Sequence, residues 1–277
     1  GRAPRGIVVG GGLLGLEAAE GLKDLGAEPT ILDVAPWLLS VEVDQGGGYA
    51  VNAQIKATGI EIETGVYISG INKDADGNVV SVSIADSPSE DAEIRTLPAD
   101  MVVFGAGIRP NDELARDADL ALGERGGILV NDACHSSDEH IWAIGEVACV
   151  LGRTWGLVAP ANAMADAVAA NLLNDNEEAQ VEEFDIATKL KFSGVQVAGF
   201  GDRRGTTEGC LEVLFADPAR GMYQKIVTSG DAKTLLGGVF VGDTAPFDSL
   251  KPLLGRELPA EPNVYLTAAG GGDGIPD

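Results

Sequence analysis

The sequence has few of the residues that hold metal ions. Its three cysteines, Cys134, Cys149 and Cys210, lie far apart and form no C-x-x-C pair. They cannot supply the four thiolates of an iron–sulfur cluster or a structural zinc site. The two histidines, His135 and His140, share one polar loop without further ligand spacing. We therefore expect no metal site and interpret the cysteines as small, partly buried apolar residues.

Positive charge is also scarce, since 19 lysines and arginines face 43 aspartates and glutamates among the 277 residues. The formal net charge of −24 argues against nucleic acid and anionic membranes as partners. An acidic, solvated surface is the simplest interpretation. Adaptation to a salty cytoplasm and docking to a basic redox partner remain open.

Long apolar runs are missing as well. No stretch approaches the roughly 18 apolar residues of a membrane span, and no signal-peptide pattern opens the sequence. These features predict a soluble, cytoplasmic protein.

Glycine, by contrast, is abundant, and its most informative cluster begins at Gly10. The β-branched run Ile7–Val9 predicts a buried strand that stops at this cluster. The apolar-periodic stretch 13–25 then predicts a helix that Gly26 ends as a C-cap. Strand, glycine-rich turn and helix form the setting in which G-x-G-x-x-G indicates a dinucleotide site.

Each residue of this motif has a predicted role. Gly10 permits the tight turn, Gly12 lets the backbone approach a pyrophosphate, and Gly15 lets the helix pack closely on the strand. The N–H groups of the first helical turn, at Leu13 and Leu14, and the helix dipole would attract the anion.

An acidic residue completes the predicted dinucleotide site. The strand 29–34 contains Asp33, eighteen residues past Gly15, and a carboxylate there can accept hydrogen bonds from an adenosine ribose. A glycine cluster that arose by chance would not explain an acidic residue at this distance from the motif. The segment Val34-Ala-Pro36 offers no cation for a 2′-phosphate, so the sequence favours NADH, with NADPH as the weaker candidate.

The first predicted domain ends near residue 107. A helix is expected over 42–58, where Gly46-Gly-Gly48 indicates either close backbone approach or a broken first turn, because each glycine costs roughly 1 kcal/mol relative to alanine. Further strands are predicted at 60–64, 66–71, 79–84, 94–97 and 101–104. The last strand runs into Gly105, Ala106 and Gly107, at the carboxyl edge where open α/β sheets bind ligands. A surface turn is the alternative interpretation of these three residues.

After residue 107 the sequence contains a mixed strand and helix region, a region of short β-type runs, and a tail. Strands are predicted at 127–131 and 140–144, the second ending in Gly145-Glu146, and a helix at Ala161–Leu173 whose first-turn N–H groups are open to a ligand. Short β-type runs follow at 188–192, 195–200, 211–216, 222–229 and 235–241. They predict a small α+β or all-β domain. The tail 258–277 is rich in proline and glycine and is expected to be flexible.

Taken together, these motifs resemble the two-dinucleotide-binding flavoproteins of the pyridine nucleotide–disulfide oxidoreductase family. Gly10–Glu17 matches the family's NAD motif, Gly105–Asn111 its A-T-G-x-x-P-N segment, and Ala143–Ala148 its second FAD motif with Glu146 in place of aspartate. Segments around 44–48, 188–202 and 235–243 are most similar to the flavoprotein part of the NAD(P)H-dependent nitrite reductase large subunit. A resemblance to the electron-input subunit of assimilatory nitrate reductase is the alternative.

The resemblance implies an α/β fold in four parts. They are a Rossmann-like NAD-binding domain with a β-meander (1–107), the C-terminal part of a FAD-binding domain (108–180), a small C-terminal α+β domain (181–257) and the tail (258–277). It also implies that FAD and NADH are the cofactors, with hydride passing from nicotinamide C4 to flavin N5.

The resemblance assigns further site residues. Gly145 and Glu146 would hold a ribityl hydroxyl of FAD, and N–H groups at Val158, Ala159 and Ala161 would face the flavin N1–C2=O edge. Glu17 would lie on the nicotinamide side, although an exposed first-turn carboxylate explains it nearly as well. For Lys189, a solvated side chain is preferred over a place at the flavin edge. No catalytic residue is predicted.

Two departures from the family pattern bear on function. The family's first FAD motif is absent, and no iron–sulfur or sirohaem ligands follow residue 250. The sequence is therefore expected to be a fragment, or one piece of a larger subunit, that cannot reduce nitrite by itself.

The leading hypothesis is an electron-input module that oxidises NADH and passes electrons through FAD to iron–sulfur and sirohaem centres elsewhere. A stand-alone NADH-dependent ferredoxin or rubredoxin reductase and a non-catalytic NADH-binding module are the alternatives. A short-chain dehydrogenase is disfavoured, because Tyr223 and Lys225 do not have its Tyr-x-x-x-Lys spacing.

Overall fold

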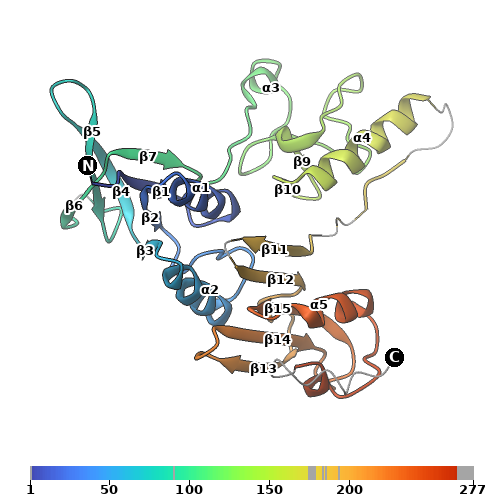
Figure 1. Cartoon of the computed structure of the whole chain (residues 1–277). Coiled ribbons are helices and arrows are strands. Elements are labelled where there is room, and N and C mark those ends of the chain that lie inside the picture. The colour runs from blue at the N-terminus through green and yellow to red at the C-terminus, as the bar shows by residue number, and fades with distance from the viewer. Residues whose placement is uncertain are drawn as a thin grey trace. The chain divides into compact units, whose positions relative to one another are not determined.

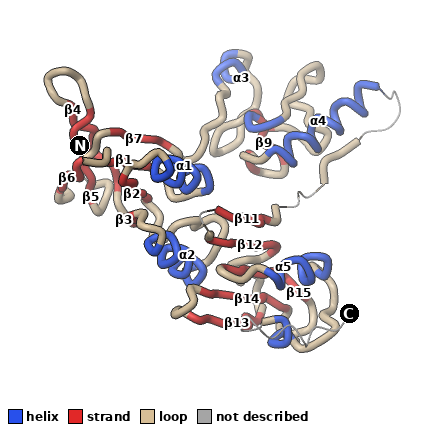
Figure 2. Tube along the Cα trace, viewed as in Figure 1, coloured by secondary structure: helices blue, strands red, loops and turns tan. Residues whose placement is uncertain are grey.

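The computed structural model describes residues 2–89, 91–173, 179–182, 184, 186–192 and 194–266. The chain divides into two compact units. The first joins residues 1–107 to residues 186–277, and the second comprises residues 108–185. Figures 1 and 2 show the course of the chain through both units.

A parallel sheet forms the centre of the N-terminal half of the first unit (Figure 1). Its order is β3-β2-β1-β7, and each neighbouring pair runs parallel. The strands are β1 (Arg5–Val9), β2 (Glu28–Asp33), β3 (Glu61–Thr64) and β7 (Met101–Phe104). Helix α1 (Leu13–Asp24) connects β1 to β2, as the glycine motif predicts. The α/β fold expected from the sequence is confirmed.

Both faces of this sheet are covered, in keeping with the continuous apolar runs Ile7–Val9 in β1 and Met101–Phe104 in β7. Successive side chains of a strand point to opposite faces. Val8 and Ile31 accordingly lie in the core shared with α1, while Ile7 and Leu32 pack into a second core beneath a β-meander. The meander is an antiparallel sheet of order β4-β5-β6. Its strands are β4 (Tyr67–Lys73), β5 (Val79–Ala85) and β6 (Ile94–Pro98).

The C-terminal half of the first unit is a five-stranded antiparallel sheet of order β11-β12-β15-β14-β13. The strands are β11 (Thr188–Phe192), β12 (Val195–Gly201), β13 (Leu211–Asp217), β14 (Met222–Thr228) and β15 (Leu235–Val241). One face packs on helix α2 (Gln45–Ala57), and the two share a continuous apolar core with the parallel sheet (Figure 2).

The glycine triplet at the start of α2 is explained by close approach rather than by a broken turn. Helix α2 includes all three glycines and begins at Gln45, later than the predicted residue 42, because Asp44 is its N-cap and accepts a hydrogen bond from Gly47 N at 3.0 Å. A Cβ at Gly46 would lie 2.3 Å from the Tyr223 ring, and one at Gly48 would lie 2.1 Å from the Trp37 ring. The helix can therefore approach β14 at Gly46, and the loop that carries Trp37 at Gly48, only if these positions lack side chains.

The other face of the C-terminal sheet is covered by its own helices. These are α5 (Ala245–Leu250) and the 3₁₀ turns η2 (Lys251–Leu253) and η3 (Pro262–Tyr265). The domain is thus α+β. Leu258 and Tyr265, from the stretch expected to be flexible, are buried in this core, so that expectation is wrong as far as residue 266. Residues 267–277 lie outside the described residues.

The described part of the second unit contains short elements and the longer helix α4. They are α3 (Glu113–Asp117), β8 (Ile128–Leu129), the 3₁₀ turn η1 (Gly145–Val147), β9 (Ala148–Val150), β10 (Arg153–Thr154) and α4 (Val158–Leu173). Helix α4 begins three residues before the predicted Ala161.

The predicted strand at 140–144 is wrong. Its backbone groups bond across a tight loop instead of to a neighbouring strand: Ser136 N donates to Ile141 O, and Ala143 N donates to Cys134 O. The Asn131 side chain holds this loop by accepting from the backbone N–H groups of Ala133 and His135. Side chain–backbone bonds of this kind compete with strand pairing.

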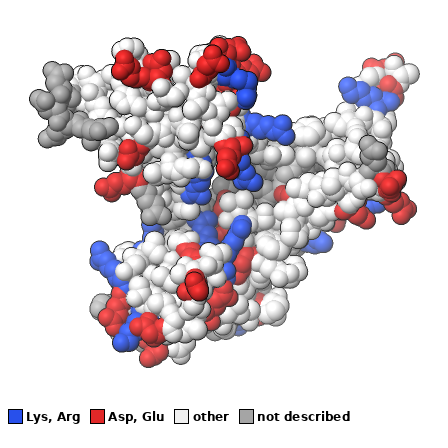
Figure 3. Space-filling model, turned by 180° about the vertical axis from the view of Figure 1, so that it is seen from behind, with Lys and Arg blue, Asp and Glu red and all other residues white. Residues whose placement is uncertain are grey.

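Acidic side chains are distributed over the face drawn in Figure 3, in several separate groups with lysines and arginines among them. Of the helices in the described part of the chain, none is long and apolar enough to cross a membrane.

Candidate functional site

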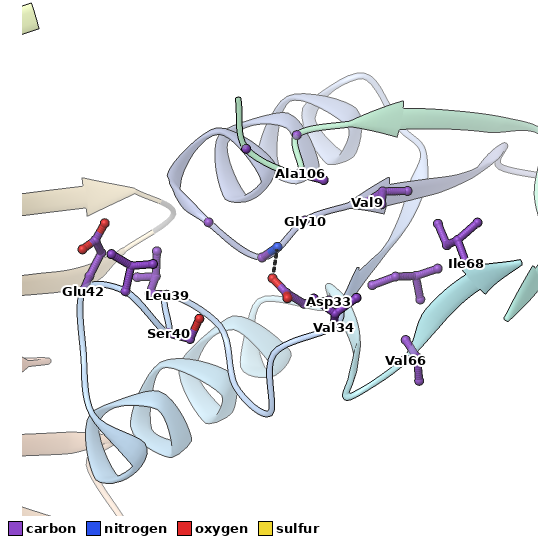
Figure 4. A pocket seen from close by; sticks show the side chains of 16 residues that line it. Val9, Gly10, Asp33, Val34, Leu39, Ser40, Glu42, Val66, Ile68 and Ala106 are labelled. Atoms are coloured by element: carbon purple, nitrogen blue, oxygen red, sulfur yellow. Dashed lines mark hydrogen bonds between the residues drawn. The ribbon is translucent and has the colours of Figure 1, made fainter. Parts of the chain in front are cut away.

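A pocket of about 290 Å³ opens at the carboxyl ends of β1, β2 and β7 (Figure 4). Its lining comes from the glycine-rich turn, the end of β2, the loop before α2, the start of the meander and the turn after β7. The lining residues are Val9, Gly10, Gly11, Gly12, Leu32, Asp33, Val34, Leu39, Ser40, Val41, Glu42, Val66, Ile68, Gly105, Ala106 and Gly107. A crevice at this edge of the sheet is where open α/β folds bind their ligands.

The glycines of the motif are required by backbone packing. Gly10 has φ +111°, and a Cβ there would lie 2.4 Å from Gly105 O. A Cβ at Gly15 would lie 1.8 Å from Gly10 O. Helix α1 and the turns after β1 and β7 therefore meet backbone to backbone, as the spacing of the motif predicts.

The start of α1 fits an anionic ligand. Its N-cap is Gly12, which supplies no side-chain hydrogen bond, and its first turn carries no acidic residue. A Cβ at Gly12 would have nothing within 4 Å, so there is open space beside the start of this helix. Unsatisfied N–H groups and the helix dipole favour a phosphate at such a terminus.

Asp33 lies in the middle of the pocket and has a structural role that the sequence does not reveal. Its carboxylate accepts hydrogen bonds from Gly11 N at 2.5 Å and from Ala35 N at 2.7 Å, and so ties the glycine loop to the end of β2 (Figure 4). A carboxylate has about four acceptor positions. Two of these positions are used by the backbone N–H groups of Gly11 and Ala35.

The structure brings most of the predicted dinucleotide residues together. Gly10, Gly12, Asp33 and the turn 105–107 line the pocket. Gly15 lies behind it in the helix–strand contact. Leu13 and Leu14 open α1, and Glu17 is exposed one turn further along this helix.

The wall formed by Leu39–Glu42 was not predicted. From the sequence, a helix is expected to begin at residue 42, and no role is assigned to residues 39–41. In the structure Glu42 Oε2 accepts a hydrogen bond from Arg203 Nη1 at 3.1 Å, across 161 residues of sequence. Burial raises the pKa of the Glu42 carboxyl, although the Arg203 guanidinium opposes this. No local pattern could have indicated a contact of such long range.

The predicted flavin residues lie in the second unit. Gly145 and Glu146 form the turn η1, which contacts the start of α4. Val158, Ala159 and Ala161 lie in the first turn of α4, where Pro160 has no N–H. The sequence therefore offers three, not four, first-turn donors.

The surroundings of this turn fit a flat, partly apolar group. Glu146 is exposed, and so are the apolar side chains of Ile144, Leu157 and Val158, the last at 74%. The turn η1 and the residues at the start of α4 thus present exposed apolar side chains together with one exposed carboxylate.

Known families match both units. A family model described as pyridine nucleotide-disulphide oxidoreductase matches residues 2–170, and one described as the rubredoxin NAD+ reductase C-terminal domain matches residues 187–258. The nitrite reductase [NAD(P)H] large subunit of Klebsiella oxytoca is 41% identical over 269 residues, and the nitrite reductase (NADH) large subunit of Escherichia coli K12 is 39% identical over 277 residues. These alignments cover 96% and 99% of this chain but only 27% and 32% of the relatives.

A solved structure has the same fold. The NAD-dependent persulfide reductase from A. fulgidus superposes with a TM-score of 0.77 at 24% identity, over 92% of this chain and 49% of that one. Because the first family model covers more than half of the sequence and the pocket carries its glycine motif, the chain belongs to the pyridine nucleotide-disulphide oxidoreductase family.

Proposed function

We propose that this chain is the electron-input part of an NAD(P)H-dependent flavoprotein oxidoreductase of the nitrite reductase type. The observation that carries the proposal is the pocket in which Gly10, Gly12 and Asp33 converge at the open N-terminus of α1. We assign NADH binding to residues 1–107, part of the FAD site to residues 108–180, and a supporting role to residues 181–257.

In the first unit, each element of the pocket has a task toward the dinucleotide. The N–H groups of Leu13 and Leu14 bind the pyrophosphate. The Asp33 carboxylate accepts hydrogen bonds from the hydroxyls of the adenosine ribose. The apolar side chains of Val34 and Ile68 provide surface for the adenosine. The carboxylate of Asp33 repels a 2′-phosphate, which favours NADH over NADPH.

In the second unit, Glu146 holds a ribityl hydroxyl of FAD, and the first turn of α4 faces the flavin N1–C2=O edge. When bound, FAD accepts two electrons from NADH and releases them singly or in pairs. The N–H groups of Val158, Ala159 and Ala161 stabilise negative charge at that edge.

The similarity to nitrite reductase large subunits supports an onward route for the electrons. Since the chain spans 27% and 32% of those relatives, the iron–sulfur and sirohaem centres that would reduce nitrite are assigned to sequence outside it. The cytoplasm, where NADH is plentiful, is the proposed location.

A second candidate is an NADH-dependent reductase of ferredoxin or rubredoxin. The match of residues 187–258 to the rubredoxin NAD+ reductase C-terminal domain favours it. The two candidates share NADH oxidation and differ only in the electron acceptor.

The visible spectrum of the purified chain, recorded with and without added FAD and then with NADH under anaerobic conditions, tests the proposal. We expect bound flavin whose visible absorbance bleaches when NADH reduces it. NADH binding without flavin uptake would mean either that residues 108–180 hold too little of the FAD site to bind flavin alone or that the chain is an NADH-binding module.

Replacing Glu146 by alanine should weaken FAD retention about tenfold, the usual size of one lost charge-assisted hydrogen bond. Glu139, an exposed carboxylate of the same unit, provides the control, because Glu139→Ala removes the same charge from a loop outside η1. Flavin content is measured after gel filtration. Equal retention in both variants would contradict the role of Glu146.

A further inference from the structure

The loop that forms one wall of the pocket is held from two sides. Figure 4 shows Leu39, Ser40 and Glu42 across the pocket from Val66 and Ile68, with Asp33 between them. At its start the loop is tied to the glycine turn, because Leu39 N donates to Gly11 O at 2.8 Å. Two further contacts come from the turn that follows β12 in the C-terminal domain: Arg204 donates to Ser40 O, and Arg203 donates to Glu42.

The Arg203 side chain is itself rigidly anchored. It is only 8% exposed and lies next to the 19% exposed Glu42 side chain. Its Nη2 atom donates to Ile186 O and, at 3.1 Å, to Thr188 Oγ1. A planar guanidinium that engages several acceptors at once fixes their relative positions, which a lysine ammonium does less well.

The turn that carries both arginines is built around Asp202. Its carboxylate accepts hydrogen bonds from the backbone and the hydroxyl of Thr206, at 3.0 and 3.1 Å, and from those of Thr207, both at 2.7 Å. These bonds hold the pKa of Asp202 well below its ordinary value although burial alone would raise it. These hydrogen bonds therefore fix the conformation of the turn that carries Arg203.

We propose that Arg203 is a positioning residue for the dinucleotide: from the C-terminal sheet it fixes Glu42, and with it the pocket wall Leu39–Glu42, for the adenosine half of NADH. This inference rests on the proposed dinucleotide site. It gives the C-terminal domain an indirect part in nucleotide affinity, since its buried cation holds one wall of a pocket that is lined by the N-terminal domain.

A second buried cation of the same interface provides a matched control. Lys225 is 1% exposed and pairs with Asp44 at 2.6 Å and Glu212 at 3.1 Å. Neither Lys225 nor Asp44 lines the pocket. In a Lys225→Met variant Asp44 keeps the Tyr223 hydroxyl at 2.7 Å and the Gly47 N–H, so the start of α2 stays capped.

The test measures binding of NADH and of ADP-ribose to the whole chain by calorimetry, together with the melting temperature. Arg203→Met should raise the Kd of both ligands about tenfold, and Lys225→Met should leave both Kd values within twofold while it lowers the melting temperature as much or more. Arg203→Lys should recover part of the affinity. Glu42→Ala combined with Arg203→Met should bind no more weakly than either single variant, because the two residues act as one unit.

Each outcome of this test either supports or overturns the inference about Arg203. Equal Kd changes in the Arg203→Met and Lys225→Met variants would show that loosening the interface, not positioning of the wall, lowers affinity, and would overturn the inference. An unchanged Kd in Arg203→Met would overturn it as well while leaving the dinucleotide site in place. If the unsubstituted chain bound neither ligand, the proposed function would fail and the inference with it.

Discussion

Replacing Gly15 by alanine should both destabilise the chain and abolish NADH binding. The new Cβ would lie 1.8 Å from Gly10 O, a backbone atom that no side-chain rotation can move away. Overpacking of this kind costs about 3 kcal/mol or more, the upper end of the usual range. Helix α1 would shift off β1 and carry the pyrophosphate-binding N–H groups with it, so we expect NADH affinity to fall at least about 100-fold.

Gly12→Ala is the matched control, because the same methyl group is added three residues earlier in the same motif. Gly12 has φ −83°, which alanine tolerates, and its Cβ would have no neighbour within 4 Å. Stability should change by less than roughly 1 kcal/mol, since alanine is a poorer N-cap than glycine but restricts the unfolded chain more. The methyl group would occupy the space assigned to the pyrophosphate, so affinity should still fall about tenfold.

Thermal unfolding and NADH titration of the two variants separate packing from binding. A Gly15→Ala variant with the melting temperature of the parent would contradict the helix–strand contact. A Gly12→Ala variant with unchanged Kd would contradict the place assigned to the pyrophosphate.

The sequence predicts those parts of the fold that depend on interactions between residues close together in the sequence. The β-branched run Ile7–Val9, the glycine spacing and the short β-type runs of the C-terminal domain each depend on neighbours within a few residues, and the structure contains these elements. The stretch 140–144 has a similar apolar pattern, yet Asn131 and the polar loop before it satisfy its backbone in another way. Periodicity does not distinguish a strand from an apolar loop that is hydrogen-bonded to itself.

The parts that could not be predicted depend on contacts between distant residues. Gly46 and Gly48 lower the stability of a helix, and the reason for them is the close packing of the Tyr223 and Trp37 rings on these two positions. The pocket wall at Glu42 likewise needs Arg203, which no spacing rule connects to it. The candidate site was thus predictable where a motif forms it, at the glycine turn and Asp33, and not where the C-terminal sheet completes it.

Replacing Asp33 by serine together with Ala35 by arginine should shift the preference from NADH toward NADPH. The Asp33 carboxylate lies where it can accept ribose hydroxyls, and the same charge repels a 2′-phosphate. A serine hydroxyl can still accept one of the two N–H bonds, from Gly11 or Ala35, that the carboxylate now accepts. The arginine then supplies the cation that Val34-Ala-Pro36 lacks.

We expect the ratio of NADPH to NADH affinity to rise about 100-fold, equivalent to roughly 2.8 kcal/mol. The isosteric Asp33→Asn variant is the control, because it removes the repulsion without adding a cation and should change the ratio only about tenfold. Both Kd values are measured on the whole chain after its melting temperature has been compared with the parent, since Asp33 also holds the glycine loop. A ratio that stays constant in a folded double variant would exclude Asp33 as the ribose ligand, because neither the lost carboxylate nor the new guanidinium would then lie near the 2′-position.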